Sequence, residues 1–264
     1  MLALRSTPGS AHGLTALQRA ETAARTDAAD WVATQVSHSA VVSCDPQVCS
    51  ALVAAGFPAA NLRKLGPSTP YPVTSNLVII TANVRALFGS SLATEYAPDV
   101  LTTFGTGAAQ ITIRIIAQHG AAAYQHALDS EIAYGKQLGA DILGSRQIST
   151  TLTAKSDLLA GLVDQRLLLA LTGLAFRHPI DIVDFGTYDY NGSTSLPLRY
   201  VDVAESVPAA HMSQSAYVAS MLSVLNSLTA PYRSLPPVTL TLNGQLVLRI
   251  AYSAPSPLDL LGPG

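Results

Sequence analysis

The sequence has few charged residues and no long hydrophobic run. Both features count against certain classes of protein. Only 12% of its 264 residues are charged, against 48% hydrophobic, and the formal net charge is −2. This composition is typical of a folded chain, and it provides no overall positive field to attract nucleic acid or an anionic membrane. The most apolar run, residues 167–176, has arginine on both sides and is about half as long as a transmembrane helix. We therefore expect no membrane-spanning segment within this sequence.

Cysteine is equally scarce, since only Cys44 and Cys49 are present. Between them, Asp45 is a favoured helix N-cap, and Pro46 suits the first helical position because its missing N–H costs nothing there. The sequence therefore predicts a local disulfide that joins the end of a strand to the first turn of a helix. Disulfides persist in oxidising compartments, so the pair predicts an extracytoplasmic protein; the alternative is a cytosolic protein with two buried thiols. Because residues 1–5 lack the apolar core of a signal peptide, we expect a signal or membrane anchor in a segment that precedes this sequence.

The sequence also lacks the motifs of common enzyme classes. It contains no Gly-x-Ser-x-Gly, no Ser-x-x-Lys and no His-Glu-x-x-His, which counts against serine hydrolases, penicillin-binding proteins and zinc proteases. His119 and His126 are seven residues apart, a spacing that suits a metal poorly. Residues 105–107 form a hairpin turn rather than a dinucleotide-binding loop, because a strand follows them instead of a helix. We therefore expect no catalytic residue, no metal site and no cofactor.

Short apolar runs alternate with helical patterns in the first half of the chain. Residues 40–43 and 77–80 predict two buried strands, which we expect to be parallel because continuous apolar runs are typical of sheets covered on both faces. The capped helix at residues 46–55 lies between them. Residues 101–104 and 110–116 predict a closing hairpin. This alternation is typical of an α/β protein.

The second half continues the alternation after residue 117. The expected elements are helices at 120–138, 156–175 and 214–228, strands at 180–185 and 198–203, and a hairpin at 238–252 with a type I′ turn at Asn243-Gly244. We therefore predict an α/β fold of two small Rossmann-like or α+β units, each a mostly parallel sheet with a terminal hairpin. The predicted domains are a linker at 1–23, an α/β domain with the disulfide at 24–117, and a second α/β or α+β domain at 118–264.

A group of carboxylates in the second half is the best candidate for a binding site. Asp181, Asp184 and Asp202 are expected at neighbouring strand ends. Tyr188 and Arg199 lie on or beside the loop between those strands. Together these five side chains could line a polar pocket for a glycan or a peptide. The alternative is that they are strand-end and turn residues on a solvated loop.

Three stretches resemble a known family. Residues 30–36 (a W-V-A-x-x-V helix), 42–45 and 104–114 resemble the soluble extracytoplasmic domain that follows the membrane part of some actinobacterial glycosyltransferases, over roughly residues 26–116. Nearly the whole chain, including the strand-Cys-Asp-Pro-helix-Cys motif and residues 254–258, is similar to uncharacterised single-pass membrane proteins of actinobacteria. The abundance of alanine and the preference for arginine over lysine agree with such a source. Because the glycosyltransferases keep their catalytic carboxylates in the membrane part, the resemblance implies no glycosyl transfer here.

A weaker resemblance is to zinc D-alanyl-D-alanine carboxypeptidase-like domains. It rests on residues 163–168, 178–180 and 201–202. The loop at 186–195 contains no histidine, so Asp202 lacks the upstream ligand that a zinc site would need. This resemblance therefore implies an ancestral metal site that has been lost.

These features together predict a non-enzymatic, extracytoplasmic binding or adaptor domain of a membrane-anchored cell-envelope protein. The expected partner is an envelope protein or a cell-wall component, not nucleic acid, and the membrane is reached only through a segment outside this sequence. One alternative is a cell-wall or carbohydrate-active hydrolase that uses the aspartates, which carboxylates about 5–10 Å apart across an open cleft would favour. The other alternative is a sensor that binds a small ligand between the two halves.

Overall fold

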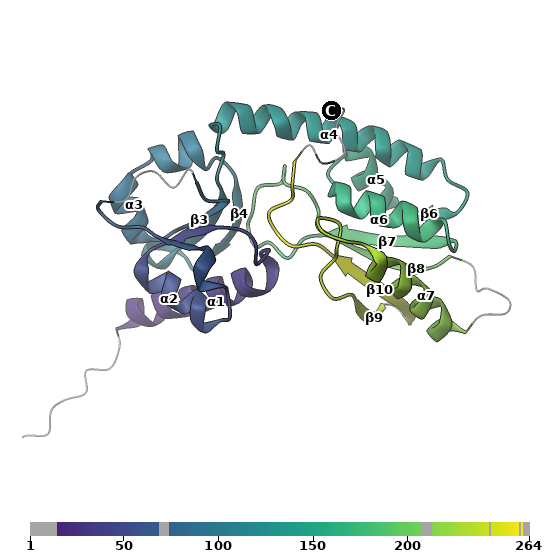
Figure 1. Cartoon of the computed structure of the whole chain (residues 1–264), viewed down its shortest axis with the longest axis horizontal. Helices are drawn as coiled ribbons and strands as arrows, with labels where there is room; N and C mark the ends of the chain where they lie inside the picture. Colours follow the sequence, from purple (N-terminus) through teal and green to yellow (C-terminus); the bar gives the residue numbers. More distant parts are fainter. Residues whose placement is uncertain (1–14, 69–73, 207–212, 243, 259, 261–264) are drawn as a thin grey trace, which may run out of the picture.

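The computed structural model describes residues 15–68, 74–206, 213–242, 244–258 and 260. It has two lobes, which we define as the first lobe (residues 15–117) and the second lobe (residues 118–260). Each lobe is built around one five-stranded sheet, and the long helix α4 (Ala121–Leu143) passes along the top of both lobes in Figure 1. Within the described part of the chain, no helix is both long enough and apolar enough to cross a membrane.

The first lobe is a mixed sheet with helices on both faces. Its elements are, in chain order, α1 (Ala16–Gln35), β1 (Val42–Cys44), α2 (Pro46–Ala54), β2 (Leu62–Lys64), β3 (Leu77–Ile80), α3 (Ala82–Phe88), β4 (Val100–Phe104) and β5 (Ile111–Ile115), with short 3₁₀ turns at Ala59–Asn61 and Gly107–Ala109 and a π turn at Leu92–Tyr96. The strand order is β2-β1-β3-β5-β4. Leu77 and Ile79 of β3 pack with α1 and α2, and Val78 and Ile80 pack with α3 on the other face.

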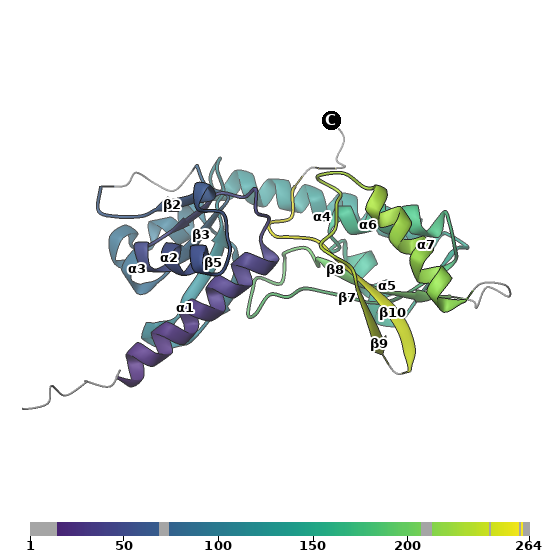
Figure 2. The same cartoon turned by 60° about the horizontal axis from the view of Figure 1, so that its bottom comes forward.

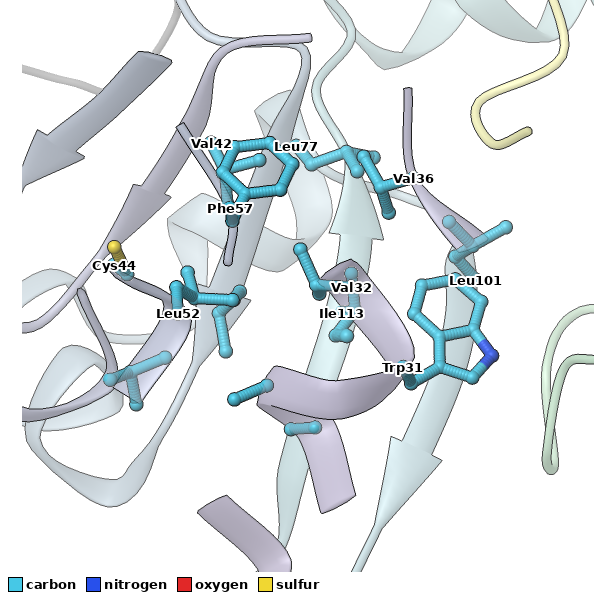
Figure 3. Close-up of a cluster of buried hydrophobic side chains, with 14 of the residues drawn as sticks. Trp31, Val32, Val36, Val42, Cys44, Leu52, Phe57, Leu77, Leu101 and Ile113 are labelled. Atoms are coloured by element: carbon cyan, nitrogen blue, oxygen red, sulfur yellow. The ribbon is translucent and has the colours of Figure 1, made fainter. Parts of the chain in front are cut away.

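Helix α1 supplies much of this core and reaches the boundary with the second lobe. It begins at Ala16, after an N-cap by Thr15, so residues 16–23 of the expected linker are helical; residues 1–14 lie outside the described residues. Figure 3 shows Trp31 at the edge of the buried cluster, with its indole nitrogen turned away from the other labelled side chains. This position makes Trp31 available to contacts from outside the first lobe.

The second lobe carries its helical core on one face of its sheet. After α4 come β6 (Ile148–Thr150), α5 (Leu152–Ala160), α6 (Gln165–Ala175), β7 (Ile180–Gly186), β8 (Tyr200–Glu205), α7 (Gln214–Ser227), β9 (Val238–Leu242) and β10 (Gln245–Ala251), with strand order β6-β7-β8-β10-β9. The apolar side chains of α6 and α7 cover alternate residues of β7, β8 and β10. Figure 2 shows α6 and α7 side by side over these strands.

The predicted single helix at 156–175 is wrong, because it is two helices. Helix α5 ends at Gly161, which has a φ of 73°, and α6 starts again after an N-cap by Asp164. A Cβ on Gly161 would lie 2.3 Å from the carbonyl oxygen of Ile132, so only glycine allows α5 to approach α4 this closely. The break therefore comes from helix packing as well as from backbone conformation.

The α/β class is confirmed, whereas the prediction of mostly parallel sheets is wrong. The pairs β1–β2, β1–β3 and β6–β7 are parallel, and the other five pairs between described strands are antiparallel. The apolar run at 77–80 predicts a strand that is buried on both faces of its sheet. A mixed sheet also buries both faces, so burial alone does not determine the direction of the neighbouring strand.

Each lobe ends in the same strand, helix and hairpin arrangement, which accounts for the antiparallel pairs other than β7–β8. In β3-α3-β4-β5 and in β8-α7-β9-β10, the last strand returns antiparallel between the first strand and its hairpin partner. The hairpin predicted at 238–252 is confirmed by β9 and β10. Asn243 of its predicted turn lies outside the described residues, while Gly244 has a φ of 80°.

The predicted disulfide between Cys44 and Cys49 is confirmed, with Cα atoms 5.5 Å apart. It joins the end of β1 to α2, whose first residue is Pro46 and whose N-cap is Asp45. One oxygen of Asp45 accepts the first free N–H groups of α2, and the other accepts the hydroxyl of Thr81 at 2.6 Å. The cap therefore also ties β1 to the start of α3.

Candidate functional site

The predicted aspartate Asp202 is held in an ion pair. Its side chain is only 1% exposed, and both of its oxygens accept hydrogen bonds at 2.7 Å from the guanidinium of Arg249. This hydrogen bonding raises the pKa of Arg249 above its ordinary value. The same guanidinium stacks over the ring of Tyr200 at 4.2 Å from its centroid. Asp202 is thus neutralised and covered rather than presented to a ligand.

Asp181 and Asp184 are half-buried on β7, on the same strand but in different surroundings. Asp181 accepts a hydrogen bond at 2.9 Å from the hydroxyl of Ser149. Asp184 lies opposite Asp202 in the pairing of β7 with β8. Burial raises the pKa of Asp157 on α5, and the negative charge of Asp184 raises it further. Neither Asp181 nor Asp184 lines any of the five main cavities among the described residues.

Arg199 is as deeply buried as Asp202, at 1% exposure. Its guanidinium donates to the carboxylate of Asp189, to the hydroxyl of Thr187 at 3.4 Å and to the carbonyl oxygen of Tyr252 at 3.2 Å. It also lies 5.9 Å from the ring centroid of Trp31, so it touches the first lobe. Burial lowers the pKa of Arg199, and the charge of Asp189 opposes part of this shift. Arg199 therefore acts in the contact between the lobes.

The loop after β7 makes polar contacts between the second lobe and the first lobe. The indole N–H of Trp31 donates to the carbonyl oxygen of Tyr188 at 3.0 Å. The backbone N–H of Thr103 donates to the carbonyl oxygen of Tyr190 at 2.8 Å, and that of Ser193 donates to Val100 at 2.7 Å. The loop thus pairs with the outer edge of β4, whose backbone groups would otherwise be unpaired there.

Gly192 is required for this pairing. A Cβ at Gly192 would lie 2.4 Å from the carbonyl oxygen of Leu101, closer than any side chain can come. A second connection runs through Ala254, which exchanges backbone hydrogen bonds with Gln35 and Ser37 at 2.7 and 2.9 Å. The two lobes are therefore joined at fixed points beside α1.

A cavity of about 690 Å³ opens next to these contacts, and we call it the junction cleft. Its walls come from α1, from the end of β4 with its following turn, and from the loop after β7. It is lined by Asp27, Asp30, Trp31, Thr34, Gln35, Thr103, Phe104, Gly105, Thr106, Tyr188, Tyr190 and Asn191. Its volume lies within the range of about 300–1,000 Å³ that is usual for small-ligand pockets. Of the five predicted ligand residues, only Tyr188 lines it.

Aromatic rings form one side of the junction cleft. Trp31 and Phe104 have ring centroids 6.3 Å apart at an interplanar angle of 59°, and Phe104 and Tyr190 are 5.9 Å apart at 60°. Tyr190 is 60% exposed, whereas Trp31 is 6% exposed. The rings are therefore inclined to one another rather than stacked flat, with Tyr190 open to the solvent.

The charged side chains of the junction cleft are both carboxylates. Asp27 and Asp30 are exposed and three residues apart on α1, so their side chains are neighbours on one helix face. Neither forms an ion pair within the described part of the chain. The Oε1 atom of Gln35 is buried and has no hydrogen-bond partner among the described residues. No lysine, arginine or histidine is among the described residues that line the cleft.

Two further cavities differ from the junction cleft. A groove of about 620 Å³ between α4, β6 and α6 is mostly apolar, and Phe176 at its rim is 88% exposed. A cavity of about 210 Å³ lies at the carboxyl ends of β1 and β3, where open α/β sheets often bind ligands. There, however, Asp45 already satisfies the first N–H groups of α2.

Sequence reasoning missed most of the junction cleft. The local sequence signal for the cleft is a D-x-x-D-W pattern at Asp27, Asp30 and Trp31. It places two carboxylates and an indole within about one turn of a helix. No protein-family model, curated protein or solved structure matched the chain. Among the described residues, no cluster of three or more His, Cys, Asp or Glu side chains could hold a metal ion. Function is therefore inferred from the geometry of the junction cleft.

Proposed function

We propose that this chain is a non-enzymatic, extracytoplasmic binding domain of a membrane-anchored cell-envelope protein, and that it binds a cell-wall component in the junction cleft. The observation that carries the proposal is the cleft itself, in which both lobes contribute aromatic rings and hydrogen-bonding groups to one cavity. Ligand sites commonly combine an aromatic lining with a few polar groups in this way.

The disulfide supports the proposed location. Cys44 and Cys49 are paired, and such bonds persist in oxidising compartments such as the space outside the cytoplasmic membrane. The proposed anchor lies in a segment outside this sequence. Mass spectrometry of protein purified with and without reductant checks the pairing, and two free thiols in air-exposed protein would contradict it.

The ion pairs of the second lobe favour binding over hydrolysis. A general acid or base must reach the substrate within hydrogen-bond distance. Asp202 and Asp189 are instead buried against Arg249 and Arg199. A sensor that binds a small ligand between the lobes would use the same cleft, so it is a variant of this proposal rather than a separate site.

The test is retention by insoluble cell wall. The full chain is mixed with peptidoglycan sacculi from an actinobacterium and sedimented, and we expect it to be retained. The variant Tyr190→Ala removes an exposed ring of the cleft and should weaken retention about tenfold. Phe176→Ala removes a more exposed ring outside the cleft and should be retained like the unmodified protein. The proposal fails if the unmodified chain stays in solution, or if Tyr190→Ala sediments equally well.

A further inference from the structure

We infer that the ligand of the junction cleft carries a protonated amine. This inference rests on the proposed function, because it specifies the chemistry of what that cleft binds. It follows from the charge of the cleft, from its unpaired acceptors and from the arrangement of its rings.

The charge of the junction cleft has one sign. Asp27 and Asp30 bring two negative charges to its lining, and no described lining residue brings a positive one. Arg199 lies beside Trp31, but it is paired with Asp189 and therefore adds no net positive charge there. The field in the cleft thus favours cations and opposes phosphate or carboxylate ligands.

The charged groups of the cleft are hydrogen-bond acceptors. The carboxylates of Asp27 and Asp30 accept only, whereas the hydroxyl and amide side chains of the lining can both donate and accept. An ammonium group has three N–H donors and no acceptor, which matches these carboxylates.

The aromatic rings add an attraction that depends on charge. Tyr190 packs against Phe104 at 60° and is 60% exposed, so a ligand in the cleft can lie against the ring of Tyr190. A cation placed over the electron-rich face of that ring is attracted by the ring quadrupole, and a neutral group of the same shape is not. The rings also pack against the apolar part of the ligand that bears the amine.

Two kinds of cell-wall component carry this chemistry, namely amino sugars and peptides with a side-chain amine. Matched pairs separate the amine from the rest of each molecule. The first pair is the glucosamine disaccharide and its N-acetylated form; the second is Nα-acetyl-lysine amide and its Nε-acetylated form. In each pair, acetylation removes the charge and leaves the body of the molecule.

Binding is followed with the full chain by calorimetry and by the fluorescence of Trp31, the only tryptophan in the sequence and a lining residue of the cleft. The measurement is made at mildly acidic pH, where the amines of the probes are protonated. We expect the cationic member of at least one pair to bind, to shift the Trp31 emission, and to bind at least about tenfold more tightly than its acetylated counterpart. Added salt should weaken that binding, since it screens exposed charges.

Variants place this effect in the cleft. Asp27→Asn with Asp30→Asn should weaken binding of the cationic probe roughly tenfold, because two exposed charge contacts are lost. Asp129→Asn makes the same change on an exposed carboxylate of α4 outside the cleft and should change nothing. Tyr190→Phe keeps the ring and should bind like the unmodified protein, whereas Tyr190→Ala should not. Thermal unfolding of each variant checks that it is folded.

The possible failures are distinguishable. If the acetylated probes bind as tightly as the amines, or if the double aspartate variant binds the amines normally, the inference is overturned while the proposed function stands. The same holds if neither amine binds although sacculi are retained through Tyr190. If sacculi are not retained at all, the proposed function itself fails.

Discussion

Replacing Arg199 by methionine tests how the two lobes are held together. Its side chain is 2% exposed and that of Asp189 is 5% exposed, and Arg199 also donates to Thr187 and to the carbonyl oxygen of Tyr252. Methionine keeps much of the apolar stem but leaves the carboxylate of Asp189 buried without its cation. Breaking a buried ion pair from one side costs about 3–5 kcal/mol. The variant should therefore lose a large part of a typical domain stability of about 5–15 kcal/mol.

The measurement is urea denaturation followed by circular dichroism and by Trp31 emission. Because Arg199 lies over Trp31, both probes should report the same lowered midpoint, and the melting temperature should fall by roughly 10 °C or more. Arg63→Met changes an exposed arginine of β2 and should cost no more than about 0.5 kcal/mol.

The double variant Arg199→Met with Asp189→Leu identifies the cause. If the loss comes from an uncompensated charge, removing that charge as well should recover much of the stability, because apolar replacement of a whole buried pair is often close to neutral. The reasoning is refuted if Arg199→Met stays within about 1 kcal/mol of the unmodified protein, since that is the ordinary effect of a point substitution. A double variant no more stable than the single one would refute it too.

Two other predictions concern the lobe junction and the core of the second lobe. Gly192→Ala should displace the loop from the carbonyl oxygen of Leu101 and lower the free energy of unfolding by about 1–3 kcal/mol, measured by thermal unfolding. The control is Gly173→Ala in α6, where the nearest atom is 3.8 Å away, and it should be neutral or slightly stabilising. Equal melting temperatures of the two variants would contradict this prediction. Burial raises the pKa of Tyr252 to about 12, so its contribution to stability is fully present below the unfolded pKa of about 10 and is lost as the pH rises toward 12. Tyr252→Phe should therefore show a shallower loss of stability over that range in urea titrations, and an unchanged slope would count against it.

Local signals in the sequence were sufficient for local structure. The Cys44-Asp45-Pro46 sequence predicted the N-cap, the first helical residue and the disulfide, because each depends on residues within one turn of α2. The apolar run at 77–80 likewise predicted burial on both faces of β3. It could not predict the antiparallel neighbour β5, because strand direction depends on a connection made over 30 residues further along the chain.

The junction cleft is a different case, because its parts are distant in the sequence. Asp27 and Asp30 come from α1, Phe104 from the end of β4 and Tyr190 from the second lobe. Only the pairing of the loop after β7 with β4 brings them together. Tyr188 was identified for its nearness to the aspartates of the second lobe, yet its carbonyl oxygen serves the lobe contact by accepting the indole N–H of Trp31.

Whether the polar groups of a crevice already have partners within the protein decides how well that crevice is suited to a ligand. At the carboxyl ends of β1 and β3, the carboxylate of Asp45 already accepts from two N–H groups of α2 and from Thr81, so a ligand there would have to replace hydrogen bonds that exist. In the junction cleft, the exposed carboxylates of Asp27 and Asp30 form no ion pair among the described residues. A ligand that donates hydrogen bonds gains free energy at unsatisfied acceptors and little at satisfied ones. The proposed ligand site is therefore the junction cleft, where the two lobes meet, and not the crevice at the carboxyl ends of β1 and β3.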